Sequence, residues 1–390
     1  MSLFKRREIS GPTAGELIPP RPMQQAGGVT VTNESALRHS AVWACLRLRA
    51  NLVSTMPVDV YRKVGEMKVE VPKPPVLIAP GGDRVGMMEW LYSTQFDLDR
   101  AGNAFGLITA RDGLGLPARI ELVPLADVTV RQRDGAVTYK IGQQEYAADE
   151  VWHERQYTMA GLAVGLSPIA YAAWSIGEYL SIQQFALDWF GSGAVPSAML
   201  RNTGKTIDPQ AAEEAKRRFK AATMQGDLFV TGSDWEYKMV QAENAGADWI
   251  EAKRYGVSDV ARFFDVPGDL IDAGTGGSMT YANITQRNLQ FLVMNLGPAI
   301  IRREDALSSL TSRPRFVKLN TDALLRMDPQ TRAAMLRTQI ESRQLAPSEA
   351  RELEDRQPFT ESQLSEFDRL FGTKNPAPTP AASAPTGAST

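Results

Sequence analysis

The chain has 390 residues, of which 43% are hydrophobic and 23% charged, and its formal net charge is -2. This length and apolar content predict a soluble globular protein with a sizeable core, organised in two or three structural units. The near-neutral charge argues against tight nucleic-acid binding, which depends on clustered Lys and Arg side chains against phosphate. Any DNA that the protein handles should therefore be held loosely.

Few residues are available for metal or redox chemistry. The single cysteine, Cys45, excludes an intrachain disulfide and a cysteine-rich metal site. Only His39 and His153 supply imidazoles, so both are predicted to be structural and no cofactor is expected. The basic start of the chain is not followed by an apolar run, and no apolar stretch reaches the roughly 18 residues of a membrane helix. We expect neither export nor membrane insertion.

The first part of the chain reads as an arm, two helices and several strands. Prolines and glycines without periodicity predict a flexible arm over residues 1–28. Leucines and alanines at helical spacing behind an Asn33 cap predict a helix over 34–56, and another is expected over 87–100. Turn signals such as Asp134-Gly135 separate stretches of strand character. The expected strands are 58–62, 103–111, 117–124, 128–133, 136–141 and 151–154.

The middle of the chain alternates long helices with a compact insert. Ser167-Pro168 should cap a long helix with one apolar stripe that ends at Gly191. The insert then reads as a strand at 197–201, a helix at 210–224 and a hairpin at 228–241. Acidic residues at the start of the insert helix and basic residues at its end suit the helix dipole. Its basic residues are Lys216, Arg217, Arg218 and Lys220.

A helix, a loop and a second helix follow. Over 247–266, one helical face carries the apolar residues Trp249, Ala252, Gly256, Val260 and Phe263. Another face carries Glu251, Arg254, Ser258 and Arg262. Pro267-Gly268 should stop this helix, and a glycine-rich loop follows that should be mobile. The loop comprises Gly274, Thr275, Gly276, Gly277, Ser278 and Met279.

The last part of the chain resumes helical periodicity. A long helix from about residue 280 should kink or end at Pro298, which cannot donate to the carbonyl four residues back. A strand at 315–320 and helices starting at Pro329 and near Pro347 come next. From Thr373 onward, Pro, Ala, Ser and Thr dominate, which predicts a disordered tail.

Three glycine-containing stretches resemble nucleotide-binding motifs. Gly204-Lys205-Thr206 ends like a phosphate loop, but the required upstream glycine position is Met199, which favours a plain turn. Residues 113–118 have the spacing of a dinucleotide fingerprint, yet they lead into Pro117 and a strand. The glycine loop at 274–277 has the flexibility to cradle a phosphate, but no lysine or preceding strand accompanies it. Each of these is more simply a turn or a linker.

Several stretches, in this order, resemble one protein family. They are "SAVWACLRLRANLVSTMPVDVYRK", "GNAFGLI", "GLSPIAYAAWSIG", "VARFFDVPGDLI", "TYANITQRNLQFLVMNLGP" and "FVKLNTDALLRMD". From about residue 30 to 370 the chain resembles phage portal proteins, in the compact branch of long-tailed phages and gene transfer agents. The resemblance implies an α/β (α+β portal) fold. The implied divisions are arm 1–28, wing 29–166 and 281–326, stem helices 167–193 and 244–266, clip 194–243, tunnel loop 267–280, crown 327–372 and tail 373–390.

The resemblance also implies a role that is structural and not enzymatic. It implies a dodecameric ring at one capsid vertex of the virion, assembled in the host cytoplasm, through which double-stranded DNA is packaged and ejected. Its partners would be other copies of the chain, the terminase large subunit, the major capsid protein and the head-tail adaptor, and no membrane. The loop at 274–279 would meet the DNA, and the face of Glu251, Arg254, Ser258 and Arg262 would line the channel. The basic residues of the insert helix would dock the motor or the adaptor.

Two other functions stay open on the residues alone. A soluble α/β enzyme that binds a phosphorylated ligand at the glycine loop would be a monomer or a small oligomer. Another phage head or adaptor component would form a ring without the long helix-loop-helix. Trp174, Trp189 and Trp249 lie on or near the long helices and belong either to an intrachain core or to a contact between subunits.

Overall fold

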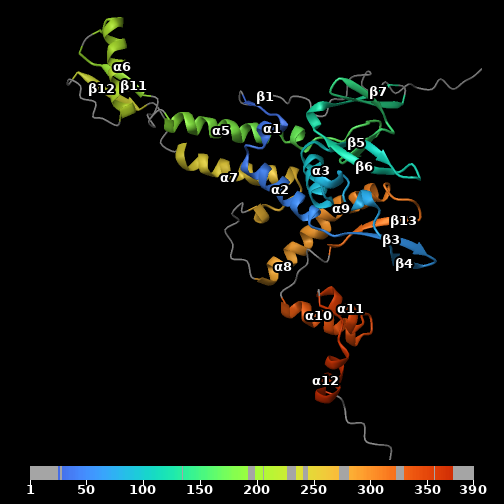
Figure 1. The fold of residues 1–390 in the computed structure, drawn as a ribbon. Coiled ribbons are helices and arrows are strands. Elements are labelled where there is room, and N and C mark those ends of the chain that lie inside the picture. Colours follow the sequence, from blue (N-terminus) through green and yellow to red (C-terminus); the bar gives the residue numbers. More distant parts are fainter. Residues whose placement is uncertain are drawn as a thin grey trace, which may run out of the picture. The chain divides into compact units, whose positions relative to one another are not determined.

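The computed structural model describes most of the chain in two compact units, Met1–Thr321 and Asp322–Thr390 (Figure 1). The described residues are 25–26, 29–133, 135–191, 198–204, 206–225, 234–239, 245–271, 281–321, 329–354 and 356–371. Within these ranges, no helix has the length and apolar character to cross a membrane. The same ranges contain no group of three His, Cys, Asp or Glu side chains that could hold a metal ion.

The first predicted helix is divided in two, which corrects the expectation of one helix over 34–56. α1 (Asn33–Ala36) is capped by Thr32, not by Asn33, in a capping box with Ser35. α2 (Ser40–Ser54) starts anew, because His39 is extended and its Nδ1 accepts a hydrogen bond from the backbone N–H of Ala41 at 3.1 Å. A histidine thus serves as a helix cap, a role usually taken by Ser, Thr, Asp or Asn.

One antiparallel sheet joins strands from distant parts of the sequence. Its order is β13 (Arg315–Leu319), β3 (Val58–Val64), β4 (Met67–Glu70). The prediction missed β4, whose four residues are all exposed and therefore show no alternation of apolar and polar positions. Gly65, at φ +59, turns the chain between β3 and β4.

Two further three-stranded sheets belong to the body. One has the order β10 (Val151–Arg155), β5 (Asn103–Arg111), β6 (Pro117–Val123), and the other β7 (Val128–Arg133), β8 (Ala136–Ile141), β9 (Gln144–Ala147). The predicted bounds of β5, β7 and β8 are confirmed. Short 3-10 turns occupy Pro75–Leu77, Gly82–Arg84 and Leu125–Asp127. Phe105, Val130 and Tyr139 belong to the core that these sheets share.

A close backbone contact fixes the end of α3 (Met87–Ala101). The helix stops at Gly102, which has φ +72. A Cβ atom at this position would lie 2.1 Å from the carbonyl oxygen of Leu166, so only glycine fits. This contact ties the end of α3 to the segment that leads into the long helices.

Two long helices run side by side (Figure 1). They are α5 (Ala173–Gly191) and α7 (Ala245–Phe263). A short helix, α4 (Pro168–Tyr171), precedes α5 and is capped by Ser167, whose hydroxyl accepts the N–H of Ala170. Between α5 and α7 in sequence lie β11 (Ala198–Asn202), α6 (Pro209–Gln225) and β12 (Trp235–Met239), and β12 pairs antiparallel with β11.

The end of the predicted arm also lies against a long helix. β1 (Gln25–Ala26) pairs with β2 (Val29–Thr30), and both contact α5. The rest of the arm and the predicted strand that starts at 228 lie outside the described residues, as does the C-terminal tail.

The predicted kink or end at Pro298 takes the form of a change of helix type. α8 (Tyr281–Gln290) passes into a π-helix, Phe291–Leu296, and then into α9 (Gly297–Ser308). Pro298 lies in the first turn of α9, where its missing N–H costs little. Gly297 suits the tight junction, since a Cβ there would lie 3.2 Å from the carbonyl oxygen of Leu292.

The second unit is helical in its described part. It contains α10 (Pro329–Glu341), α11 (Pro347–Leu353) and α12 (Glu361–Phe371). The starts of α10 and α11 agree with the prediction from the two prolines. α12 had not been predicted.

Candidate functional site

The paired helices α5 and α7 are anchored to the body at one end. The anchoring side chains are buried and come from both helices, with Ile176 and Tyr179 on α5 and Val260 and Ala261 on α7. Between them, the Ser175 hydroxyl donates a hydrogen bond to Asp259 Oδ2 at 2.5 Å. Apolar burial and this polar contact therefore fix how the two helices leave the body.

His39 connects this anchor to α2. The centroid of its ring lies 3.8 Å from that of the Tyr179 ring on α5. Nζ of Lys253 on α7 lies 5.4 Å from the centroid of the same Tyr179 ring. Burial, assisted by the nearby Lys253 charge, lowers the pKa of His39 to about 4. The imidazole is thus neutral at physiological pH, which lets it accept the capping hydrogen bond of α2.

The predicted polar face of α7 is brought together on the helix surface. Glu251, Arg254 and Arg262 are exposed, and Ser258 is half-buried. Arg262 forms an ion pair with Asp259 at 3.3 Å. The face therefore carries both signs of charge at short spacing, not a single strong field.

The predicted packing face of α7 is partly wrong. Val260 is buried as expected, but Phe263 is 38% exposed and its neighbour Phe264 is buried instead. Along α7, Gly256 is half-buried and Val260 and Ala261 are buried, whereas Phe264 lies one residue beyond the end of the helix. Sequence spacing of three and four residues allowed either phenylalanine, and packing against the body selected one.

The outer surfaces of the pair keep large apolar side chains in water. Trp174 is 65% exposed on α5 and Tyr255 is 63% exposed on α7. The apolar stripe predicted along α5 is buried near the body, at Ala173 and Ile176, but exposed farther out, at Leu187. Phe185, which does not belong to that stripe, is also exposed. The side chains of Trp189 and Trp249 lie outside the described residues. Such a run of exposed apolar residues marks a surface for a protein partner.

The glycine-rich loop, Gly274 to Met279, lies outside the described residues, but the elements on either side of it are held together. The 3-10 turn Gly268–Ile271 precedes it and α8 follows it. Arg287 Nε of α8 lies 3.0 Å from Oδ2 of Asp269 in the turn. Asn295 donates a second hydrogen bond to Asp265 Oδ1. The described segments before and after the loop are therefore tied to each other.

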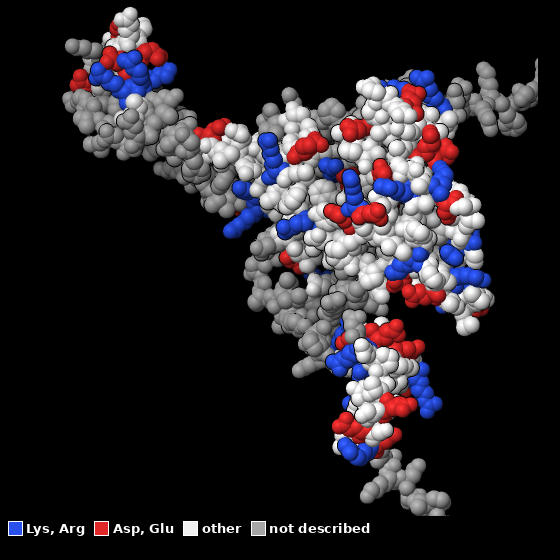
Figure 2. All heavy atoms as spheres, in the orientation of Figure 1, with Lys and Arg blue, Asp and Glu red and all other residues white. Residues whose placement is uncertain are grey.

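The basic residues of α6 are only partly available. Lys216 pairs with Glu213 at 3.3 Å and Arg218 pairs with Glu214, and all four side chains are surface-exposed. Arg217 is exposed and makes no ion pair within the part of the chain that the structure describes. The Lys220 side chain lies outside that part. In Figure 2, blue and red side chains accordingly alternate over this helix and over the visible face of the body.

Sequence reasoning missed a buried ion pair that holds the body together. Arg303 of α9 is fully buried, with Nη1 2.5 Å from Oε2 of Glu154 on β10 and Nη2 2.7 Å from the Thr94 hydroxyl on α3. Burial raises the pKa of Glu154, and the Arg303 charge opposes this shift. The one available signal was the position of Arg303, between Ile300 and Leu307 on the buried stripe of α9.

The described residues form a protein of mixed helices and strands, and its paired long helices leave large apolar side chains exposed. The profile of the phage portal protein family matches residues 40–355. The probable portal protein of Streptomyces phage phiC31 is 28% identical over 86% of this chain and 78% of its own length. The portal protein of Enterobacteria phage HK97 is 26% identical over 84% and 83%, respectively.

Solved structures agree with the sequence relatives on the fold. An HK97-family phage portal protein from Corynebacterium diphtheriae superposes with a TM-score of 0.61 at 19% identity, covering 77% of this chain and all of that one. A chain from the neck of a native gene transfer agent particle, computed with C12 symmetry, gives 0.54 at 18% identity, covering 89% and 96%. The chain belongs to the phage portal protein family. It is a structural component of a portal vertex, with the α/β fold expected from its sequence, and not an enzyme.

Proposed function

We propose that twelve copies of this chain form a closed ring whose central channel passes double-stranded DNA during packaging and ejection. The observation that carries the ring is the exposed apolar surface of α5 and α7, at Trp174, Leu187 and Tyr255. Covering such side chains is favourable by roughly 25 cal/mol per Å² of apolar area. A neighbour in a ring covers them by a heterologous contact that closes by rotation. The number twelve follows the C12 symmetry of the gene transfer agent neck.

The polar face of α7 is our candidate for the channel lining. The Glu251 carboxylate offsets the Arg254 charge along this face, and Arg262 is already paired with the half-buried Asp259 beside it. DNA that meets balanced charge releases few counterions and is not gripped, so it slides. The loop from Gly274 to Met279 would then reach the DNA from the fixed base formed by Asp269 and Arg287.

The remaining divisions of the chain follow the family pattern. We assign the body to the wing, α5 and α7 to the stem, residues 194–243 to the clip and residues 327–372 to the crown. The exposed cation Arg217 on α6 is the centre of a docking face for the terminase large subunit and, later, the head-tail adaptor. The major capsid protein would surround the ring, which would be assembled in the host cytoplasm before it becomes part of the virion.

Electron microscopy of the purified chain, with mass photometry on the same sample, tests the ring. The expected result is a hollow ring with the mass of about a dozen chains of 42.8 kDa. A monomer that forms no ring at any concentration would contradict the proposal.

Packaging assays test the channel lining. Glu251→Ala combined with Arg254→Ala should lower the amount of packaged or retained DNA, while rings still form. The matched control is Lys63→Ala combined with Glu66→Ala, an exposed pair of opposite charges at the β3–β4 turn. If the stem variant packages DNA as well as the control does, α7 does not line the channel with this face.

Motor docking tests the clip. Arg217→Glu should weaken association with the terminase large subunit, whereas Arg62→Glu, an exposed arginine on β3, should leave it unchanged. Equal binding by the two variants would exclude the α6 face as the docking surface.

A further inference from the structure

The described part of the C-terminal unit has almost no buried core. Among residues 332–354 and 356–371, only Ala350 is buried. Leu336 and Ile340 of α10 are half-buried, and Leu353 of α11 is 54% exposed. Helices of this length are marginal in water unless an apolar face is packed against something. The unit therefore requires a partner to become a stable structure.

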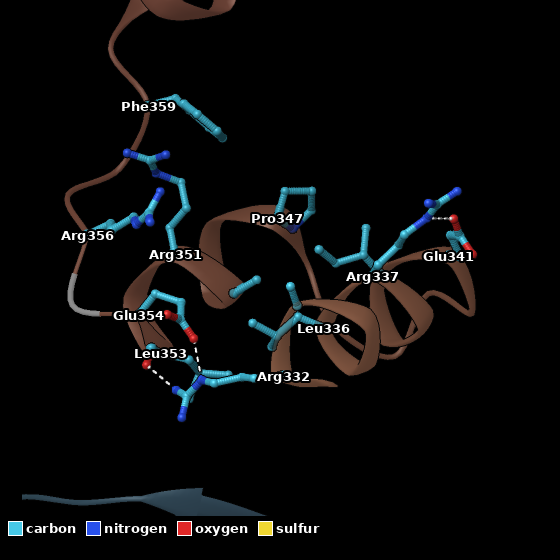
Figure 3. A pocket seen from close by; sticks show the side chains of 13 residues that line it. Arg332, Leu336, Arg337, Glu341, Pro347, Arg351, Leu353, Glu354, Arg356 and Phe359 are labelled. Atoms are coloured by element: carbon cyan, nitrogen blue, oxygen red, sulfur yellow. Dashed lines mark hydrogen bonds and ion pairs between the residues drawn. The ribbon is translucent and has the colours of Figure 1, made fainter. Parts of the chain in front are cut away.

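The same unit contains a groove of about 930 Å³ between α10, α11 and the segment that follows α11 (Figure 3). Apolar side chains from all three parts line it, including Leu336, Pro347 and Phe359. Four arginines and two glutamates also line it, which makes its surface basic. These are Arg332, Arg337, Arg351 and Arg356, with Glu341 and Glu354.

The arginines of the groove differ in how many interactions they already make within the chain. Arg332 pairs with Glu354 and donates to the carbonyl oxygen of Leu353 at 2.9 Å. Arg351 lies over the ring of Phe359, with 3.9 Å from its Cζ to the ring centroid. Arg356 is exposed and makes no ion pair in the described part of this unit, and Figure 3 shows it beside Arg351 at one edge of the groove. An acidic, apolar ligand would complement this surface.

α12 has those properties. Leu364, Phe367 and Phe371 follow one another at spacings of three and four residues, and the last is 76% exposed. Its acidic residues are Glu361, Glu366 and Asp368, against one basic residue, Arg369. The helix is thus amphipathic and acidic, and it leaves its apolar stripe in water.

The geometry of the connection keeps α12 from filling the groove of its own chain. α12 begins at Glu361, two residues after the groove residue Phe359. Within the chain, Phe367 packs edge-on against Phe359, with centroids 5.2 Å apart, while Leu364 and Phe371 stay exposed. We propose that α12 of one copy docks into the groove between α10 and α11 of a neighbouring copy. This inference rests on the proposed ring and names the contact that closes it at the C-terminal unit.

Disulfide trapping tests whether α12 docks into the groove of a neighbouring copy. It uses two full-length chains that carry different cysteine substitutions. One chain carries Ala333→Cys, at the groove, and the other carries Leu364→Cys, on the apolar stripe of α12. The native Cys45 is buried and does not interfere. After co-expression, isolation of rings and mild oxidation, the mixed sample should give a disulfide-linked dimer on a non-reducing gel. Ala334→Cys, on α10 but outside the groove lining, is the matched control and should give little dimer.

The outcomes separate this inference from the ring itself. Rings that give no dimer, or that give as much with Ala334→Cys as with Ala333→Cys, overturn the docking and leave the ring intact. A chain with both cysteines that is trapped only as a fast-migrating monomer shows that α12 occupies its own groove, which also overturns the inference. Absence of rings in mass photometry overturns the proposed function and, with it, the docking of α12 into a neighbouring copy.

A charge reversal tests the recognition without removing apolar contacts. Glu366→Lys combined with Asp368→Lys should lower the dimer yield at least about tenfold, because like charges facing each other across an interface are strongly unfavourable. Arg356→Glu in the groove chain should restore part of the yield. An unchanged yield in the lysine variant would contradict the charge matching on which the docking is argued.

Discussion

The body and the C-terminal unit place their charged side chains differently. In the body, Arg303 and Glu154 are buried together, and Arg49 and Asp99 form a second buried pair at 3.1 Å. In the described C-terminal unit, the ion pair of Arg337 is exposed and that of Arg332 is only half-buried. Buried pairs require a fixed surrounding structure, whereas surface pairs contribute little to stability. The described body therefore has a packed interior that fixes charged pairs, whereas the described part of the C-terminal unit has none.

Separating the two units should produce the largest effect. A fragment of residues 1–321 should unfold cooperatively in urea, with a midpoint close to that of the whole chain. A fragment of residues 322–390 should show no cooperative transition at micromolar concentration, because only Ala350 is buried in its described part. The helix content of this fragment, measured by circular dichroism, should increase as its concentration rises. A cooperative, concentration-independent transition of this fragment would show that the C-terminal unit is stable by itself, as the body is.

The second largest effect should come from breaking the buried ion pair of Arg303 and Glu154. Arg303→Met leaves the Glu154 carboxylate buried without its partner, which should lower the free energy of unfolding by about 3–5 kcal/mol. The exposed pair of Arg337 and Glu341 supplies the control, and Arg337→Ala should not change the unfolding curve measurably. Equal curves for the two variants would mean that the body does not rely on its buried charges.

Acidification should weaken the body through its histidines. Burial lowers the pKa of His39 to about 4 and that of His153 to about 3, against an unfolded value of 6.5. Between pH 6.5 and these values the unfolded chain binds protons that the folded chain excludes, so stability falls as pH falls. For His39 the loss is about 3 kcal/mol across this window.

His39→Asn isolates that contribution. Asparagine retains the ability to cap α2 but does not titrate. The slope of unfolding free energy against pH, measured by urea titration near pH 5, should be smaller in the variant by about one proton. A slope that is the same in both proteins would show that His39 does not exclude protons in the folded chain.

The smallest effect concerns Cys45. Burial raises the pKa of this thiol to about 12, so neither accessibility nor ionisation favours its reaction. A thiol reagent at pH 8 should leave the folded protein unlabelled over hours and label it rapidly in urea. Rapid labelling of the folded protein would indicate that the packing around α2 opens readily.

Local sequence signals determined a large part of this fold. The strands 103–111, 128–133 and 136–141 were predicted with their observed bounds, since turn residues delimit them on either side. The exposed face of α7, with Glu251, Arg254 and Arg262, also followed from helical periodicity alone. Such features depend on residues only a few positions apart. Whether that face lines a channel is a property of the assembly and stays a prediction.

Only the tertiary structure decided the remaining features. β4 has no buried residue to reveal it, and α1 and α2 are separated by a histidine cap that periodicity does not signal. Packing against the body chose Phe264 over Phe263. Arg303 and Glu154, 149 positions apart, meet because the tertiary fold brings one residue of α9 next to one residue of β10. Sequence spacing fixes which side chains share a face, but burial depends on what the rest of the chain brings against that face.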